Sequence, residues 1–169
     1  MKPNFLFLAA ALLMAGISAG LAQDTKAPPP DPTHITFTHL GELNWVGSPT
    51  GSQQHFDVLG DPKQPGLYIR IAKWLPHHHS EPHFHNNIRH MFVLSGTWWV
   101  SSGSTYNEAS LYPMTAGSIV TDLPEKSHYD GAKDEPAIIL EVGLGPLTET
   151  NCNSAPAGAP PVMNPTCKN

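Results

Sequence analysis

Two histidines, His83 and His85, stand one residue apart in the stretch PHFHNNIRHMFVLSGTWW, just before a run of strand-forming residues. Side chains alternate between the two faces of an extended strand, so both imidazoles point the same way. Two imidazoles held together on one element form half of a site for a divalent transition metal. His128, in LPEKSHYDG, follows another strand-like run and could complete the site from an antiparallel neighbour.

Two nearby residues are weaker candidate ligands. Glu81 stands two residues before His83 and therefore has the same parity. If residues 89–95 form a strand, its odd-numbered residues face inward and His90 points away, which makes His90 the weaker of the possible additions. The run of histidines at 77–79 follows a proline and is interpreted as a solvated turn, although such a run could also chelate a metal loosely.

Arg89 shares the inward parity but cannot bind a cation, because its guanidinium stays protonated and has no lone pair to offer. One interpretation gives it a structural partner, Glu141 first and Glu81 second, since a charge held inside a protein needs an opposite charge. In this interpretation it is turned away from the metal. The alternative is that Arg89 faces an open coordination position and binds an anionic substrate, a carboxylate or a phosphate.

Residues next to His128 and in the TWW run could add to such a site. Tyr129 and Asp130 are candidate acids or bases, although exposed loop positions are the alternative. Trp98 and Trp99 are consecutive, so one faces in and one out. We expect one to roof a cavity and the other to pack between sheets or subunits, and pure packing for both remains open.

The elements that would hold these residues are short and strand-like. No segment between residues 34 and 145 keeps apolar residues at helical spacing for three turns. β-branched and aromatic runs recur instead, separated by Gly, Pro, Asn and Ser, which predicts an all-β sandwich or barrel able to carry a site inside. The runs are ITFTHL, GLYIRIAKWL, RHMFVLSG, TWWVSS, GSIVTDL and AIILEVG.

The ends of the chain differ from this middle part. Residues 1–22 have a lysine near the start, an apolar core and a small-residue end, which predicts a secretory signal peptide rather than a retained membrane anchor. Residues 23–33 form a proline-rich leader, 34–146 the barrel, and 147–169 an irregular tail. The chain has 169 residues and a net charge of −5, which argues for one domain and against nucleic acid or, after signal cleavage, membranes as partners.

The only two cysteines, Cys152 and Cys167, lie in the tail. Export makes a disulfide between them the expected state, with two free thiols as the alternative. Closing a loop of this length contributes roughly 3 kcal/mol in the chain-entropy model.

The histidine spacing resembles the first and second motifs of the cupin superfamily, G-x5-H-x-H-x3,4-E-x6-G and G-x5-P-x-G-x2-H-x3-N. The first is matched by His83, His85 and Gly96, and the second by Gly117, Pro124 and His128 with one residue fewer before the histidine. The resemblance covers roughly residues 64–146, and H-x-H-x3-R with G-T-W-W looks like one bacterial cupin group. The departure is position 89, where most cupins place a glutamate ligand, so the resemblance carries over only the three histidines.

The resemblance implies an antiparallel jelly-roll barrel, a homodimer, and one metal among Fe, Mn, Ni, Cu and Zn. We expect a periplasmic or secreted metal-dependent enzyme on a small molecule, similar to the three-histidine cupin dioxygenases. A lyase or isomerase that uses the metal as a Lewis acid is one alternative. A non-catalytic module that senses or stores a metal or ligand is another, and the intact histidines argue against a structural cupin without metal.

Overall fold

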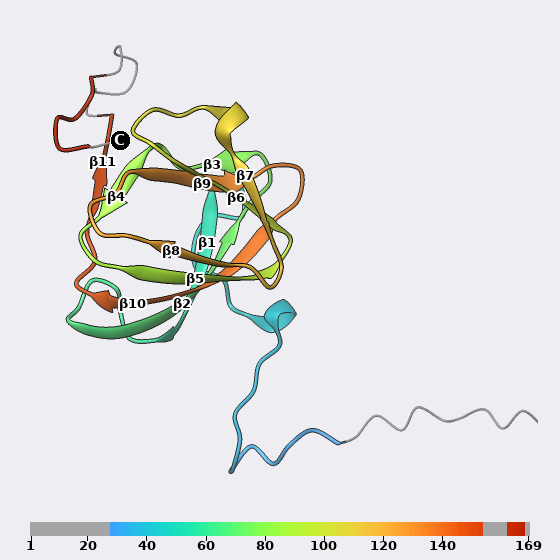
Figure 1. The fold of residues 1–169 in the computed structure, drawn as a ribbon. Coiled ribbons are helices and arrows are strands. Elements are labelled where there is room, and N and C mark those ends of the chain that lie inside the picture. Colours follow the sequence, from blue (N-terminus) through green and yellow to red (C-terminus); the bar gives the residue numbers. More distant parts are fainter. Residues whose placement is uncertain (1–27, 154–161, 168–169) are drawn as a thin grey trace, which may run out of the picture. The chain divides into compact units, whose positions relative to one another are not determined.

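The computed structural model describes residues 28–153 and 162–167, and the chain divides into two compact units, Met1–Phe37 and Thr38–Asn169 (Figure 1). In the first unit, the described residues are exposed and contain a turn in which Asp31 accepts hydrogen bonds from the backbone and hydroxyl of Thr33. The predicted signal peptide and the first residues of the leader lie outside the described residues. No helix among the residues described is long and apolar enough to cross a membrane.

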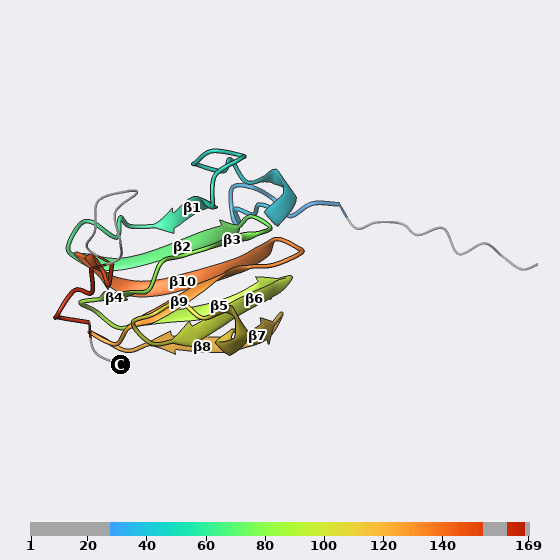
Figure 2. The same cartoon turned by 90° about the horizontal axis from the view of Figure 1, so that it is seen from above.

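The second unit is built from two antiparallel sheets that face each other, as Figures 1 and 2 show. The first sheet has five strands, which lie in the spatial order β1, β2, β10, β5, β8. The long central strands carry the β-branched and aliphatic residues that predicted them. The members are β1 (Gln53–Leu59), β2 (Gly66–Trp74), β10 (Ala137–Gly145), β5 (Arg89–Ser95) and β8 (Ile119–Asp122).

The second sheet has shorter strands, in the order β11, β4, β9, β6, β7, with β3 paired to β9. Its members are β11 (Glu149–Asn151), β4 (His83–His85), β9 (His128–Ala132), β6 (Thr97–Ser102), β7 (Tyr112–Thr115) and β3 (His78–His79). Two short 3-10 helices, Leu40–Glu42 and Glu108–Ser110, are the helical elements in the part of the chain described here. The all-β prediction is therefore confirmed.

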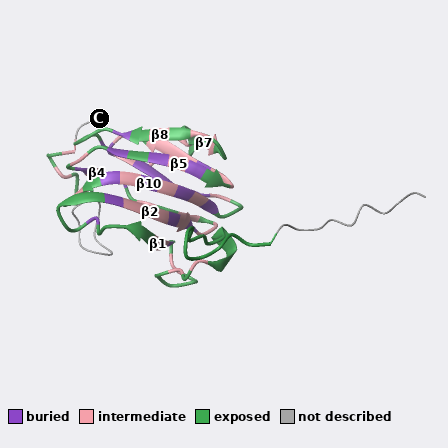
Figure 3. Ribbon diagram, turned by 90° about the horizontal axis from the view of Figure 1, so that it is seen from below, coloured by how far each residue is buried: buried purple, intermediate pink, exposed green. Residues whose placement is uncertain are grey.

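The core lies between the two sheets and follows the period of two. In β5 the odd-numbered residues Arg89, Met91 and Val93 are buried, whereas His90 and Leu94 are exposed (Figure 3). The parity assigned to this strand from the sequence is therefore correct. The buried apolar cluster takes alternate residues from both sheets: Ala72, Trp74, Met91, Val93, Trp98, Ala132, Ala137 and Ile139.

Two sequence predictions about elements differ from the structure. ITFTHL forms no strand: residues 35–39 are irregular and exposed, and Leu40 begins a short 3-10 helix. The tail, expected to be irregular throughout, contains β11, which pairs with β4. Three polar residues carry no periodic pattern, so only the partner strand reveals this element.

The predicted disulfide is present, and Cys152 is bonded to Cys167. Cys152 is buried, and its backbone N–H donates to the carbonyl of Pro82 over 2.8 Å. Its Sγ lies 3.5 Å from the hydroxyl of Ser127. The bridge therefore lies against the residues that precede His83 and His128.

Candidate metal centre

Strands β4 and β9 bring the three predicted histidines together. His83 lies directly opposite His128 in the register of the two strands. His85 is two residues along β4 and faces the same side, as the alternation requires. One ligand nitrogen from each histidine lies within 4.8 Å of the other two. The structure therefore brings together the three histidines that the sequence analysis selected.

The tautomer of each imidazole is fixed by a backbone carbonyl. The Nδ1 atoms of His83, His85 and His128 lie 2.7, 3.0 and 3.0 Å from the carbonyl oxygens of Glu81, Thr148 and Lys126 respectively. A carbonyl only accepts hydrogen bonds, so each Nδ1 carries the hydrogen and each neutral ring keeps its lone pair on Nε2.

Two of those Nε2 atoms show that a metal fits the cluster. The Nε2 atoms of His85 and His128 are buried and have no hydrogen-bond partner. A buried polar atom without a partner is costly, and a metal ion would supply the missing interaction. Neutral imidazoles with the other nitrogen held by a carbonyl are the usual form of histidine ligands.

Electrostatics favour the neutral form of these rings. Burial, together with the nearby positive charge of Arg89, lowers the pKa of His85 to about 2. Burial also lowers the pKa of His128, although the carboxylate of Asp122 opposes this effect. Deprotonated imidazoles are therefore available at neutral pH without the release of a proton.

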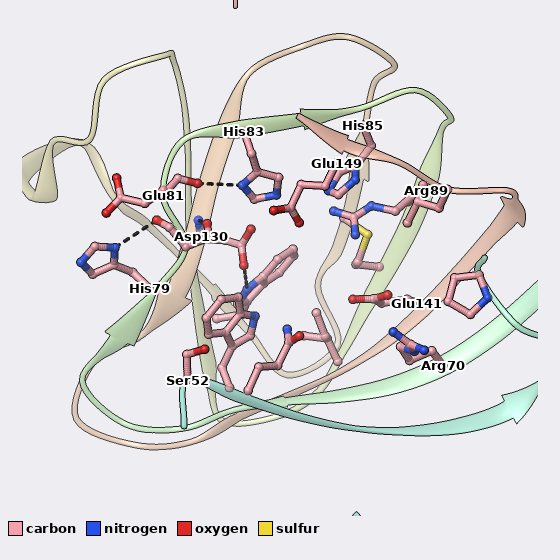
Figure 4. A pocket seen from close by; sticks show the side chains of 18 of the residues that line it. Ser52, Arg70, His79, Glu81, His83, His85, Arg89, Asp130, Glu141 and Glu149 are labelled. Atoms are coloured by element: carbon pink, nitrogen blue, oxygen red, sulfur yellow. Dashed lines mark hydrogen bonds between the residues drawn. The ribbon is translucent and has the colours of Figure 1, made fainter. Parts of the chain in front are cut away.

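The cluster opens into a cavity of about 520 Å³ (Figure 4). Its wall combines the candidate ligands His83 and His85 with apolar side chains such as Met91 and Ile139. Charged residues of both signs also line it, and these are Lys63, Arg70, Glu81, Arg89, Asp130, Glu141 and Glu149. A space of this size accommodates a small polar molecule.

Comparisons with known proteins agree with this architecture. No protein-family model matches the chain, and neither does any curated protein. Among solved structures, a cupin-like protein from Thermotoga maritima is 17% identical, with a TM-score of 0.51 over 62% of this chain and 83% of that one. A protein with a double-stranded β-helix domain from Klebsiella pneumoniae is 19% identical, with a TM-score of 0.50 over 62% of this chain and 88% of its own. The chain has the cupin fold.

A third structure with this fold is the polyketide cyclase RemF from Streptomyces resistomycificus. It is 14% identical to this chain, with a TM-score of 0.54 over 71% of this chain and 88% of RemF. Identities this low establish the arrangement of strands, so the chemistry has to be argued from the residues of the site itself.

Arg89 is buried on the inner face of β5 and forms an ion pair with Asp122 of β8. A carboxylate partner was expected, but the structure corrects its identity from Glu141 or Glu81 to Asp122. The reason is register, because Arg89 lies directly opposite Asp122 on the neighbouring strand. Glu141 contributes at longer range: burial alone would lower the pKa of Arg89, and the negative charges of Glu141 and Asp122 outweigh it and raise that pKa.

Arg89 was expected to be turned away from the metal site, but the structure places it partly toward that site. Its side chain lines the cavity, and its buried Nε has no hydrogen-bond partner.

The two weaker ligand candidates lie outside the cluster. His90 is exposed on the outer face of β5, where its Nδ1 contacts the hydroxyl of Thr121 at 3.0 Å. Glu81 contributes its backbone carbonyl to His83, and Figure 4 shows its carboxylate directed away from that imidazole. Both positions follow from the chain: His90 has outward parity, and Glu81 precedes the first residue of β4.

The candidate acids after His128 occupy opposite faces of β9. Asp130 shares the inner face with His128, lines the cavity, and accepts a hydrogen bond from Nε1 of Trp98 over 3.1 Å. Burial raises its pKa to about 6, against the opposing effect of His83. Tyr129 points to the other side, and its hydroxyl both donates to and accepts from the backbone of Asn107, at 3.1 and 3.2 Å. Asp130 is thus placed for proton transfer, and Tyr129 is fully engaged in the structure.

One of the paired tryptophans faces the cavity, as expected. Trp98 is buried and lines the cavity beside Asp130. Trp99 is half-buried, with the ammonium of Lys133 lying 4.1 Å from its ring centroid.

Two carboxylates near the histidines were missed by the sequence analysis. Asp122 lies with its Oδ2 3.2 Å from Nε2 of His128. Glu149, on β11, is the cross-strand neighbour of His85, and Figure 4 shows its carboxylate beside the histidines. Asp122 stands at the end of a predicted strand, but only the register with β5 places it. Glu149 lay in a segment assigned as irregular tail.

Proposed function

We propose that this protein is an exported, metal-dependent enzyme that acts on a small molecule in the cavity beside His83 and His85. The observation that supports it most strongly is the set of three imidazoles whose Nδ1 atoms are all held by carbonyls, which leaves three lone pairs on converging nitrogens. Such a donor set suits a divalent transition metal such as Fe, Mn, Ni, Cu or Zn.

Three neutral ligands leave open positions on the ion and do not neutralise its charge, so a bound metal supplies an electrophilic centre for substrate or oxygen. Because of this donor set, we favour an oxygen-dependent reaction similar to that of three-histidine cupin dioxygenases. The residues of the chain would bind and orient the substrate, and the apolar wall beside the cluster would limit access of water.

A second candidate is a lyase or isomerase, and one specific observation favours it. Asp130 is buried, faces the cavity from the same side of β9 as His128, and is fixed by Trp98. A carboxyl group in this position can take a proton from a bound substrate and return it to another atom. Chemistry of that kind needs the metal only as a Lewis acid and consumes no oxygen.

Export is supported by two features. Residues 1–22 have the composition of a signal peptide, and a disulfide such as Cys152–Cys167 persists in oxidising compartments. A periplasmic or secreted location would be tested by fractionation of the natural host, with mass spectrometry of the N-terminus of the recovered chain.

The proposed activity is tested first by elemental analysis of protein purified from its own periplasm or medium. We expect about one transition-metal ion per chain. Single alanine variants of His83, His85 and His128 should lose it, whereas His90→Ala should retain it, because His90 is an exposed histidine outside the cluster. Equal metal content in all four variants would refute the site.

Reaction class is decided by assays on the loaded protein with small phenolic and carbonyl compounds. Oxygen consumption that depends on His83 would establish the oxygenase. Turnover without oxygen, with solvent deuterium entering the product, would establish the lyase or isomerase if the Asp130→Asn variant loses this turnover. Metal binding with neither activity would favour the non-catalytic sensing or storage module.

A further inference from the structure

We propose that Asp122 is a fourth protein ligand of the metal, in place of the glutamate that most cupins have at the position of Arg89. The inference rests on the proposed function in one respect, namely that the three histidines hold an ion. It adds a residue that neither motif spacing nor the comparisons assign.

Two acceptor atoms, Nε2 of His128 and Oδ2 of Asp122, lie close together. Nδ1 of His128 is the donor to the carbonyl of Lys126, so the lone pair of the neutral ring lies on Nε2. That Nε2 is buried, lies 3.2 Å from Oδ2 of Asp122, and makes no hydrogen bond to it. Two lone pairs this close repel each other unless a cation lies between or beside them. A metal ion bound by both atoms resolves the contact.

The separation also matches that of two ligands on one ion. With bonds of about 2.1 Å, neighbouring ligand atoms around an octahedral or tetrahedral ion lie about 3.0 to 3.4 Å apart. The distance of 3.2 Å between Asp122 and His128 falls in this interval.

Strand register explains how a carboxylate comes to this place. Arg89 occupies the position of the usual glutamate, and Asp122 is its direct partner on β8. The carboxylate is therefore moved by one strand across the sheet. Arg89 donates to the same Oδ2 that approaches His128, so the guanidinium and a bound ion would compete for one carboxylate oxygen.

Charge balance points the same way. Alternating charges cross the inner face of the five-stranded sheet from β1 to β8. Asp57, Arg70 and Glu141 are direct cross-strand neighbours. The row then shifts by two residues to the pair Arg89 and Asp122, because Glu141 lies opposite Met91. Two arginines offset only two of the three carboxylates, so one negative charge remains. Asp122 is the buried end of the row and lies beside the histidines. A divalent cation there supplies the missing positive charge.

The test uses Co²⁺ as the probe and the apo form of the exported chain, with its disulfide intact. Asp122→Asn keeps the shape of the side chain and removes the charge. We expect Co²⁺ affinity to fall by at least the roughly 10- to 100-fold typical of losing an outer-shell partner, and the visible absorption of bound Co²⁺ to change. Asp57→Asn is the matched control, because Asp57 is also an arginine-paired carboxylate of the same row but lies at its far end. It should leave affinity and spectrum unchanged.

Arg89→Gln separates a ligand from a purely structural partner, and it decides the matter even if Asp122→Asn does not fold. It keeps the carboxylate and removes its guanidinium competitor, so Co²⁺ affinity should be equal or higher and the spectrum retained. If Arg89→Gln lowers the affinity, or if Asp122→Asn leaves affinity and spectrum as in the wild type, Asp122 is not a ligand. Failure of the wild-type protein to bind Co²⁺ would instead overturn the proposed function.

Discussion

The indole of Trp98 donates a hydrogen bond from Nε1 to Oδ1 of Asp130 over 3.1 Å. Both residues are buried, and they come from adjacent strands, β6 and β9. The bond fixes the one carboxylate that shares the inner face of β9 with His128. Trp98 thus links the apolar core to the chemistry of the cavity.

Replacement of Trp98 by Phe should therefore lower the unfolding free energy and change the pKa of Asp130. The lost hydrogen bond to a charged group corresponds to about 1.5 to 3 kcal/mol of unfolding free energy, in addition to lost packing. The pKa of Asp130 should rise above its value of about 6, because the indole stabilises the ionised form. Urea unfolding and ¹³C NMR of the carboxyl group measure the two effects.

Trp99→Phe is the control for that variant. Its ring is half-buried and lies under the ammonium of Lys133, a cation–π interaction of about 0.5 to 1 kcal/mol at exposed sites. If both variants lose the same stability and leave Asp130 unaltered, the hydrogen bond has no special role.

Arg89→Ala should destabilise the apo protein strongly. It leaves Asp122 and Glu141 buried without their shared positive partner, and breaking a buried pair in this way costs about 3 to 5 kcal/mol. Added metal should restore part of the loss, because the cation replaces the missing charge. Arg70→Ala, whose pair with Asp57 is more exposed, should lose less. An unchanged melting temperature together with lost binding of carboxylate ligands would make Arg89 a substrate clamp instead.

Removal of the disulfide should weaken the site as well as the fold. The double variant Cys152→Ser, Cys167→Ser is expected to lose roughly 3 kcal/mol, the value for a closed loop of 15 residues. The backbone N–H of Cys152 donates to the carbonyl of Pro82, and its sulfur lies against Ser127. These two residues precede His83 and His128, so metal affinity should fall too. Thermal melts with and without reductant measure the first effect. Reductant should have no effect on the double variant, and an effect there would point to another cause.

The sequence alone could identify the three clustered histidines because local rules place them. Alternation places His83 and His85 on one face, and the same rule turns His90 outward from β5. Motif spacing then supplies His128. These inferences need only the alternation of side chains along a strand and the spacing of a motif. The positions of these histidines in the structure agree with them.

The carboxylates around the histidines depend on a different kind of information. Asp122 meets Arg89, 33 residues away, because β5 and β8 pair in one particular register, and a slip of one residue would turn Asp122 to the other face. Glu149 meets His85 only because a three-residue segment of the tail pairs with β4. Register and short edge strands are set by the packing of the whole sheet, so the sequence pattern left both residues unassigned.

Tyr68 offers a test of a buried polar group that lies near Glu141, Arg89 and Asp122. Its side chain is fully buried on β2, and its hydroxyl has no hydrogen-bond partner. An unsatisfied buried hydroxyl costs about 1 to 3 kcal/mol, so Tyr68→Phe should be as stable as the wild type at pH 7 or more so. Tyr129→Phe is the matched control. It removes a hydroxyl that makes two backbone hydrogen bonds, and it should lower stability by about 1 to 2 kcal/mol.

The pH dependence of Tyr68→Phe follows from the same burial. Burial, and then the negative charge of Glu141, raises the pKa of Tyr68 from 10.0 to about 12. Between pH 10 and 12 the unfolded chain has lost this proton while the folded chain retains it, so the unfolding free energy falls as pH rises. The phenylalanine variant lacks this contribution and should lose less stability over that interval. Urea unfolding of both proteins at pH 8, 10 and 11 gives the difference. Parallel curves for the two proteins would mean that the hydroxyl is solvated or bonded in solution.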